Sequence, residues 1–342
     1  MAKAENAELV FVPLGGVGEI GMNFALYGYG PPSAREWIVI DVGVTFPDAA
    51  HPGVDLILPD TRFIEENLAN LRGIIITHAH EDHYGALLDT WPKLKAPVWM
   101  TPFSAGLLEA KRQGEQGAPK IPLTIYRAGE KFTVGPFEIE AIPVAHSIPE
   151  PMSLAITSPA GTVIHTGDWK IDPEPTIGPK TDEARFRAYG DKGVLALICD
   201  STNALREGES PSEVAVGEGL KGVIQAAKGR VAVTTFSSNV GRIVSIAKAA
   251  RDAGRQCLVL GRSLKRVIDV ADELGYMDGL PEFIAEEDFG FIPRENLVII
   301  CTGSQGEPLA ALAKLSREEM KSVSLTAGDT VVFSSRTIPG NE

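Results

Sequence analysis

Three of the six histidines of this sequence, together with one aspartate, lie within six consecutive positions. These residues are His78, His80, Asp82 and His83, and they directly follow the apolar segment 73–76. Imidazole and carboxylate ligands together suit zinc or a neighbouring first-row metal, and four such ligands in six residues can serve two ions. Isolated core or surface histidines do not explain this density. The run therefore predicts a metal site.

The expected backbone around this run turns the four side chains toward one space. His78 and His80 are two residues apart in an extended chain, so their side chains point to the same side. Asp82 and His83 then begin a helix, which turns their side chains back toward the same region. The local structure is therefore suited to a cluster of ligands.

Two further residues are candidates to complete such a site. His146 follows a strand of an expected hairpin, and Asp168 lies where another strand ends at a glycine. A carboxylate in that place can bridge two cations, which would keep it deprotonated. Each also has an ordinary explanation, as a hydrogen-bonded core or loop histidine and as a turn-forming aspartate. Asp41, at the end of the segment 37–41, either holds a ligand imidazole in one tautomer or is a plain strand-end carboxylate.

The remaining histidines and the cysteines are expected to be structural. His51 precedes a proline in a loop-like stretch, which predicts a surface position, and His165 is expected to be packed. Cys199, Cys257 and Cys301 are far apart, and each lies in or beside an apolar segment. They are interpreted as buried strand thiols, which fits a reducing cytoplasm.

The charges are distributed unevenly along the chain. The whole sequence carries a net charge of −13, yet residues 221–270 hold ten Lys or Arg and two Asp, a net charge of +8. A positive face on an acidic body attracts and orients a phosphate backbone. The alternative is that these cations are solvated faces of ordinary helices, and the sequence leaves both interpretations open.

Two loops of this basic stretch have the composition of phosphate-binding turns. Each lies between an expected strand and an expected helix, where backbone N–H groups and a cation can hold an anion. The candidate RNA-binding residues are Ser237, Ser238, Asn239, Arg242, Arg262, Ser263 and Lys265. Ordinary turns with a Ser or Asn at the helix N-cap explain the same pattern equally well.

The elements that must position these residues change in type near residue 205. Up to Asp200 the chain shows short β-rich segments, hairpins at 131–145 and 153–168, and helical patterns near 61–71, 84–95 and 103–113. Beyond it, helices alternate with strands, which predicts parallel βαβ units. We therefore expect a domain of packed sheets flanked by helices over 1–207 and a Rossmann-like parallel α/β domain over 208–342.

Length and composition agree with a two-domain globular protein. The 342 residues are 44% hydrophobic and 23% charged, which excludes wholesale disorder. No apolar run approaches the ~18 residues that a membrane span needs, and no secretory signal is visible at the start. The expected location is the cytoplasm.

Several motifs resemble a known family. The run 78–83 with His146 and Asp168 resembles the metallo-β-lactamase superfamily. Further motifs at 14–21, 199–203, 261–263, 301–308 and 338–342 resemble the β-CASP nucleases, and among them the ribonuclease J family. The resemblance implies an αββα metallo-β-lactamase domain, incomplete because its returning half is missing, followed by a truncated β-CASP domain. It thus implies an N-terminal fragment.

The resemblance also implies the roles of the site residues. One zinc would be held by His78, His80, His146 and Asp168, and a second by Asp82, His83 and the shared Asp168, with manganese as an alternative metal. The catalytic residues would be Asp82, His83, Asp168 and Asp200. In this pattern a further ligand of the second ion lies beyond Glu342, so the second site is expected to be incomplete.

The implied activity is that of a metal-dependent ribonuclease in RNA processing and decay. It would act both as an endonuclease and as a 5′→3′ exonuclease, on single-stranded RNA with a 5′-monophosphate, away from membranes. The longer parent would be a homo-oligomer. The alternatives are a small ester or thioester hydrolase, a nuclease that acts on DNA, and a catalytically weak RNA-binding paralogue. The second domain and its basic stretch favour a polymeric substrate, because small substrates need neither.

Overall fold

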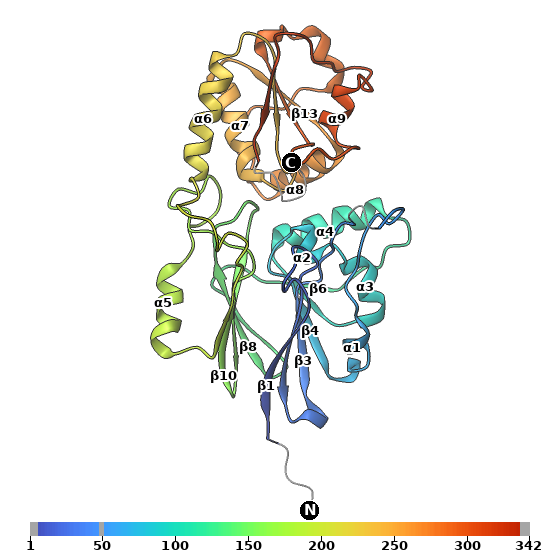
Figure 1. The fold of residues 1–342 in the computed structure, drawn as a ribbon, viewed down its shortest axis with the longest axis vertical. Helices are drawn as coiled ribbons and strands as arrows, with labels where there is room; N and C mark the ends of the chain where they lie inside the picture. The colour runs from blue at the N-terminus through green and yellow to red at the C-terminus, as the bar shows by residue number, and fades with distance from the viewer. Residues whose placement is uncertain (1–5, 48–50, 336–342) are drawn as a thin grey trace, which may run out of the picture. The chain divides into compact units, whose positions relative to one another are not determined.

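The computed structural model describes residues 6–47 and 51–335, and it divides the chain into two compact units (Figure 1). The first unit contains the chain up to His146, Glu150–Ile171 and Pro179–Glu209. The second contains Ser147–Pro149, Asp172–Gly178 and the chain from Ser210 onward. The sequence patterns did not indicate that two short earlier segments belong to the second unit. The motif at 338–342 lies outside the described residues.

The first unit contains a mixed six-stranded sheet. In spatial order its strands are β1 (Glu8–Gly15), β2 (Phe24–Gly30), β3 (Glu36–Ile40), β4 (Leu71–Ile75), β5 (Val98–Met100) and β6 (Leu123–Ile125). The first three strands pair antiparallel and the later ones parallel. The β-rich segments predicted from sequence are confirmed in this sheet.

A second sheet of five strands packs against the first. Its order is β11 (Ala196–Ile198), β10 (Gly161–His165), β9 (Met152–Ser158), β8 (Phe137–Pro143) and β7 (Lys131–Val134). Both predicted hairpins are confirmed, as β7–β8 and β9–β10. Fully buried side chains from the two sheets meet in one core, among them Tyr27 and Ile38 of the first and Phe137 and Leu154 of the second.

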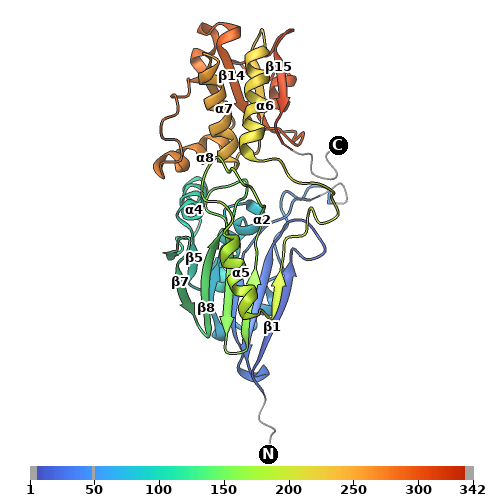
Figure 2. The same cartoon turned by 90° about the vertical axis from the view of Figure 1, so that its left-hand side faces the viewer.

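Helices cover both outer faces of this sandwich, which gives the predicted αββα architecture (Figures 1 and 2). The helices that precede the second sheet in the chain are α1 (Arg62–Glu65), α2 (Glu81–Tyr84), α3 (Leu87–Leu94) and α4 (Pro102–Gly114), with 3-10 turns η1 (Pro32–Ala34) and η2 (Leu68–Asn70). The helix α5 (Glu183–Lys192) lies over the second sheet. The predicted helix at 61–71 is only one turn followed by a 3-10 turn, and the sequence analysis did not predict α5.

A buried carboxylate attaches α5 to the sheet. Glu140 of β8 is 6% exposed and accepts hydrogen bonds from the Arg185 guanidinium and, at 2.6 Å, from the Tyr189 hydroxyl. The Arg185 hydrogen bonds lower the pKa of Glu140 to about 2, against the opposing effect of burial. The ionised carboxylate is therefore part of the folded state.

We expect Glu140→Gln to lower the free energy of unfolding by about 2 kcal/mol at pH 7, because it removes the charge that holds Arg185. The folded pKa lies below the ordinary value of 4.5, so this stabilisation is present above about pH 4.5 and is lost as the pH falls toward 2. Chemical denaturation at several pH values would test this. Glu138→Gln, an exposed change on the same strand, is the control, and a deficit that stays constant down to pH 3 would contradict the assignment.

The second unit is built on a parallel sheet, as predicted. Its four strands have the order β13 (Gln256–Leu260), β14 (Leu297–Cys301), β12 (Val231–Thr234) and β15 (Thr330–Phe333). Its helices are α6 (Glu213–Ala226), α7 (Val240–Asp252), α8 (Arg262–Glu273) and α9 (Ala311–Ser316), with 3-10 turns η3 (Glu286–Phe291) and η4 (Arg294–Asn296). Buried residues of α9 pack on one face of the sheet, and α6 lies beside α7 (Figure 1).

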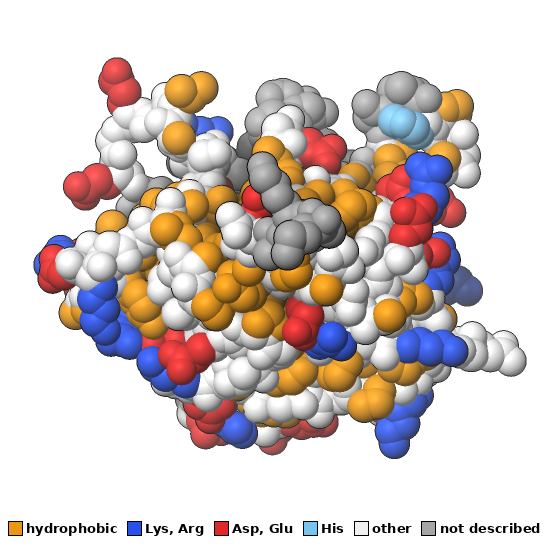
Figure 3. Space-filling model, turned by 90° about the horizontal axis from the view of Figure 1, so that it is seen from below, with side chains coloured by type: hydrophobic (Ala, Val, Ile, Leu, Met, Phe, Trp, Pro, Cys, Tyr) orange, Lys and Arg blue, Asp and Glu red, His pale blue; other side chains and the backbone are white. Residues whose placement is uncertain are grey.

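The surface carries charges of both signs. Figure 3 views the molecule from below the view of Figure 1, and on this face acidic and basic side chains are intermixed with hydrophobic ones. This face therefore lacks the single positive field that a polyanion requires. Among the helices of the described chain, none combines the length and the apolar character that crossing a bilayer requires.

Candidate metal centre

The predicted ligands meet at one edge of the sandwich in the first unit. His78 and His80 follow β4, His146 follows β8 and Asp168 follows β10. The strands β8 and β10 both pair antiparallel with β9, so their carboxyl ends lie at the same edge. Residues that are up to 90 positions apart are thereby brought together. The helix α2 adds Asp82 and His83 at the same place.

The first group consists of three imidazoles and one carboxylate. The Nε2 atom of His78 lies 3.1 Å from Nδ1 of His80, which lies 3.1 Å from Nε2 of His146. An oxygen of Asp168 lies 3.5 Å from the same nitrogen of His146. One ligand atom from each of the four residues lies within 4.8 Å of the others. This is the donor number and spacing of a tetrahedral site.

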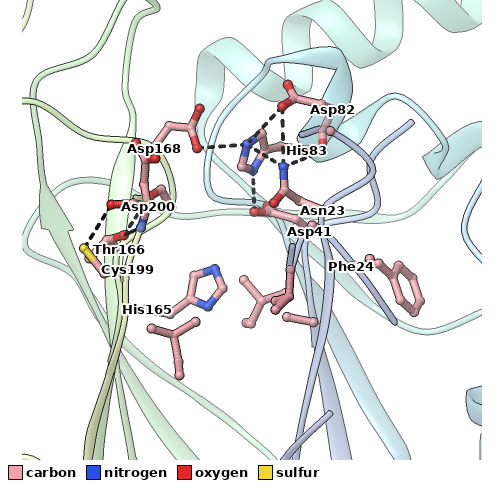
Figure 4. Close-up of a pocket in the computed structure, with 18 of the residues that line it drawn as sticks. Asn23, Phe24, Asp41, Asp82, His83, His165, Thr166, Asp168, Cys199 and Asp200 are labelled. Atoms are coloured by element: carbon pink, nitrogen blue, oxygen red, sulfur yellow. Dashed lines mark hydrogen bonds and ion pairs between the residues drawn. The ribbon is translucent and has the colours of Figure 1, made fainter. Parts of the chain in front are cut away.

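The second group shares Asp168 with the first. Nε2 of His83 lies 3.2 Å from Oδ1 of Asp168 and 3.7 Å from Oδ2 of Asp82 (Figure 4). The other oxygen of Asp168, Oδ2, is the one near His146. The two carboxylate oxygens of one aspartate are therefore divided between the two groups, which is the arrangement of a bridging ligand.

Asp41 orients the ring of His83. Its carboxylate lies 2.7 Å from Nδ1 of His83, and it accepts hydrogen bonds from the backbone N–H and the hydroxyl of Thr77. The Thr77 hydroxyl also lies 3.0 Å from Nδ1 of His78. In the neutral ring, a carboxylate on Nδ1 places the proton there and leaves Nε2 free as an acceptor. Of the two interpretations of Asp41, the structure supports the tautomer-fixing one.

Two residues of the site were missed by sequence reasoning. The side-chain amide of Asn23 lies 3.0 Å from Nε2 of His83 and donates to the carbonyl oxygen of Asp82 at 3.1 Å. A Cβ atom on Gly43 would lie 1.7 Å from that same carbonyl oxygen, so the loop after β3 can approach α2 only with glycine at this position. Both contacts join segments far apart in sequence, and no local pattern marks them.

Burial and neighbouring charges set the protonation of the cluster. Burial lowers the pKa of His78 well below its usual value, that of His80 to about 3 and that of His146 to about 4. Burial would also lower the pKa of His83, but the nearby carboxylates, Asp168 first among them, outweigh it and raise this pKa. Three imidazoles are thus neutral at pH 7 and have lone pairs available.

The donor chemistry fits divalent metal ions. Neutral imidazole nitrogens face one another with a carboxylate oxygen close by, and the outer nitrogens of His78 and His83 are held by Thr77 and Asp41. Ligands held by hydrogen bonds from behind are typical of metal sites. The first group offers four protein donors and the second three, so we expect the first to bind more tightly.

A pocket of about 410 Å³ opens beside the second group. Asp200 lines it together with Asp168, but the Asp200 carboxylate accepts from the backbone N–H and the hydroxyl of Thr202, at 2.9 and 2.8 Å. His165 also lines it (Figure 4). The Nδ1 atom of His165 lies 2.9 Å from the Tyr27 hydroxyl. Cys199 is exposed at the end of β11, so its interpretation as a buried thiol is wrong, whereas Cys257 and Cys301 are buried. His51 is exposed, as predicted.

The predicted RNA-binding residues all lie in the second unit, either in the loop after β12 or in the first turn of the helices α7 and α8. Ser237, Ser238 and Asn239 follow β12, and Arg262, Ser263 and Lys265 begin α8 after β13. The Asn239 side chain accepts a hydrogen bond from the Arg242 backbone N–H and so caps α7. For Asn239 the ordinary N-cap explanation therefore accounts for the residue.

Arg242 does not fit the role that the sequence suggested. Its guanidinium is buried, paired with the Glu213 carboxylate at 3.0 Å, and donates to the Ser334 carbonyl and hydroxyl. A guanidinium held in this way is not available to a phosphate. The count of charges in the sequence overestimated the exposed positive charge, because it does not distinguish buried side chains from exposed ones. The cations of the +8 segment that the structure leaves exposed are Lys228, Lys248, Arg251, Arg262, Lys265 and Arg266.

We expect Asp41→Asn to weaken metal binding at the second group by about 10- to 100-fold. The amide nitrogen of Asn would donate to Nδ1 of His83, so the ring proton would move to Nε2 and block the atom that faces Asp168. Zinc titration with a competing chelator would measure the loss. The exposed Asp60→Asn is the control, and unchanged affinity in Asp41→Asn would show that this carboxylate does not set the tautomer.

Two family models match the chain. Residues 36–186 match the beta-lactamase superfamily domain, and residues 228–342 match the beta-CASP domain of ribonuclease J. A crystal structure of a protein of unknown function from Enterococcus faecalis superposes with a TM-score of 0.60, covering 95% of this chain and 89% of that one, at 14% identity. That likeness concerns the fold alone.

Curated relatives are much closer in sequence. The chain is 63% identical over 339 residues to ribonuclease J of Sinorhizobium meliloti, covering 99% of this chain and 60% of the relative. It is 42% identical to ribonuclease J of Mycolicibacterium smegmatis, covering 96% of this chain and 58% of the relative. The chain thus spans at most about 60% of the length of these relatives.

Fold, ligand cluster and family models together define a metallo-β-lactamase-type protein with a β-CASP domain. Within that class, the chain belongs to the ribonuclease J family. The resemblance noted in the sequence motifs is confirmed.

Proposed function

We propose that this chain carries the catalytic centre of a ribonuclease that hydrolyses RNA phosphodiester bonds with two divalent metal ions. The observation that carries the proposal is the shared Asp168, whose two oxygens are divided between a four-donor and a three-donor group. Two ions held about one carboxylate suit displacement at phosphorus. The curated relatives bear the name ribonuclease J.

The chain's own residues have separate tasks in this proposal. His78, His80, His146 and Asp168 would hold one ion, and Asp82, His83 and Asp168 the other. When bound, such ions lower the pKa of water and stabilise negative charge on phosphoryl oxygens. Asp41 keeps the His83 proton on Nδ1, and the Asn23 amide holds α2 through the Asp82 carbonyl. Asp200 would stand at the pocket wall, beside the scissile group.

The finer features of the activity also belong to the proposal. Zinc is the expected metal, with manganese as the alternative, because imidazole nitrogens predominate among the donors. We propose endonucleolytic and 5′→3′ exonucleolytic cleavage of single-stranded RNA with a 5′-monophosphate, by a homo-oligomeric parent protein. Three unpaired cysteines support a reducing cytoplasm as the location.

The test is a comparison of substrates on one metal-loaded preparation. Matched single strands of RNA and DNA, and a small thioester, are incubated with protein treated with chelator and then with protein supplied with zinc or manganese. We expect cleavage of RNA only, and only with metal. Preferred cleavage of the thioester would instead support a small-molecule hydrolase, and RNA binding without cleavage would support a binding paralogue.

We expect Arg262→Glu with Lys265→Glu to weaken RNA binding and to flatten its salt dependence. Each lost contact with a single-stranded phosphate backbone reduces the slope of log K against log salt by about 0.7, so the pair should reduce it by about 1.4. Fluorescence anisotropy at salt concentrations between about 50 and about 300 mM measures the slope. Lys248→Glu, an exposed cation of α7, is the control. An unchanged slope in the double variant would mean that these cations form only a solvated face.

A further inference from the structure

A tyrosine and a histidine form a pair beside the metal centre and take no part in holding the ions. Tyr27 of β2 is 0% exposed, and its hydroxyl lies 2.9 Å from Nδ1 of His165, the last residue of β10. The two residues belong to different sheets, and Figure 4 shows the ring of His165 between the ribbons of the two. Sequence reasoning predicted only packing for His165, yet its half-buried side chain lines the pocket of about 410 Å³.

The hydroxyl of Tyr27 sets the tautomer of His165. Within the part of the chain that the structure describes, this hydroxyl has no other hydrogen-bond partner, and buried hydroxyls nearly always have one. Burial raises the pKa of Tyr27, so the phenol keeps its proton and donates it to Nδ1. Burial also lowers the pKa of His165 to about 4, so the ring is neutral at pH 7. A neutral ring that accepts at Nδ1 carries its one proton on Nε2.

The proton on Nε2 is left for a ligand. No described residue accepts a hydrogen bond from this nitrogen, although the ring stands in the pocket wall. An N–H group in such a place is satisfied by water or by a group that enters the pocket. The pair thus presents one uncharged donor, in a fixed orientation, to the contents of the pocket.

The rest of the lining suits a sugar better than a further phosphate. The acidic side chains of the lining are Glu19, Asp41, Asp82, Asp168 and Asp200, and the described lining includes no Lys or Arg. Carboxylates that do not hold a metal repel a phosphate group, whereas they accept hydrogen bonds from hydroxyls. The uncharged part of a nucleotide is therefore the group that fits here when its phosphate lies at the metal ions.

We propose that His165 donates a hydrogen bond from Nε2 to the ribose 2′-hydroxyl of a nucleotide adjoining the scissile bond, and so selects RNA over DNA. The inference rests on the proposed function, because it needs a nucleic-acid strand at the metal centre. One donor does not distinguish four bases, whereas the 2′-hydroxyl is an acceptor that every ribonucleotide carries and DNA lacks. Tyr27 is then a positioning residue, since it keeps the proton on Nε2.

The test combines two proteins with two kinds of substrate. Single-turnover cleavage by zinc-loaded wild type and His165→Phe is measured at one linkage of a labelled RNA, and in twins with a single 2′-deoxyribose on either side of that linkage. We expect the deoxyribose on one side to slow the wild type about tenfold and to leave the rate of His165→Phe unchanged, because a site that pairs a substrate hydroxyl rejects the analogue without it. Comparing the two ratios cancels any intrinsic effect of the deoxy sugar. His51→Ala, an exposed change outside the pocket, is the control and should keep the wild-type ratio.

Two further measurements do not depend on how well His165→Phe folds. His165→Gln keeps an N–H donor of similar reach and should keep part of the preference for the ribose. Nitrogen NMR of the metal-free protein should show the ring proton of His165 on Nε2 in the wild type. In Tyr27→Phe, which removes only the hydroxyl, both tautomers should appear and the preference for the ribose should fall.

The outcomes separate this inference from the nuclease proposal. Equal ratios in wild type and a folded His165→Phe, with metal-dependent RNA cleavage intact, would overturn the role of His165 alone. A ring proton on Nδ1 in the wild type would overturn it as well. If the wild type cleaved neither kind of strand with metal, the proposed function and this inference would fall together.

Discussion

The double variant His78→Ala/His80→Ala is expected to lose tight metal binding altogether. These two residues supply two of the four donors of the first group, and their nitrogens lie 3.1 Å apart. Two remaining donors cannot enclose a tetrahedral ion, so affinity should fall by more than about 100-fold. Metal analysis after dialysis against limiting zinc would measure the effect.

The control for this variant is His51→Ala, which removes an exposed histidine outside the cluster. It should retain the metal content of the wild type. Circular dichroism would establish that the double variant is folded. Wild-type metal content in a folded His78→Ala/His80→Ala protein would refute the ligand assignment.

The second large effect is expected from Asp168→Asn. An amide offers one oxygen where the carboxylate offers two, and it carries no charge, so both groups lose a ligand or its negative charge at once. We expect RNA cleavage at saturating metal to fall by about 100- to 1,000-fold, as for the loss of one essential electrostatic contact in an active site. Single-turnover cleavage of a labelled RNA measures this rate.

The matched control is Asp191→Asn, an exposed aspartate of α5 in the same unit. Its cleavage rate should equal that of the wild type. If Asp168→Asn cleaved RNA at a normal rate, Asp168 would not be the shared ligand, and the two groups would have to act independently.

Local patterns were sufficient to predict most of the architecture. The hairpins β7–β8 and β9–β10 and the alternation that forms the parallel sheet were visible, because strand and helix periodicities differ and Gly and Pro separate them. The helix α5 was not visible in the sequence. Its contact with the core depends on Phe186 and Tyr189, and its other side chains are largely polar. Such a helix is stabilised by its ion pair with Glu140, which lies about 45 residues away.

The candidate site was predictable to the extent that its residues are close in sequence. The run from His78 to His83 is recognisable in the sequence because it holds four possible metal ligands within six residues. The structure brings His146 and Asp168 to it. Asn23 and Gly43 could not be found in the same way, because their roles arise from backbone contacts with α2 across 40 to 60 residues. Arg242 was misjudged for a related reason, since its partner Glu213 lies 29 residues earlier.

The most direct test of the two-ion account is a single zinc titration of metal-free protein in which bound metal and RNA cleavage are followed together. The four-donor group should fill first and the three-donor group at higher zinc. We predict that cleavage appears only as the second ion binds, and that in Asp168→Asn second-ion binding is lost and cleavage falls by about 100- to 1,000-fold. Cleavage at full rate by the metal-free protein, or before any second ion is bound, would contradict the account.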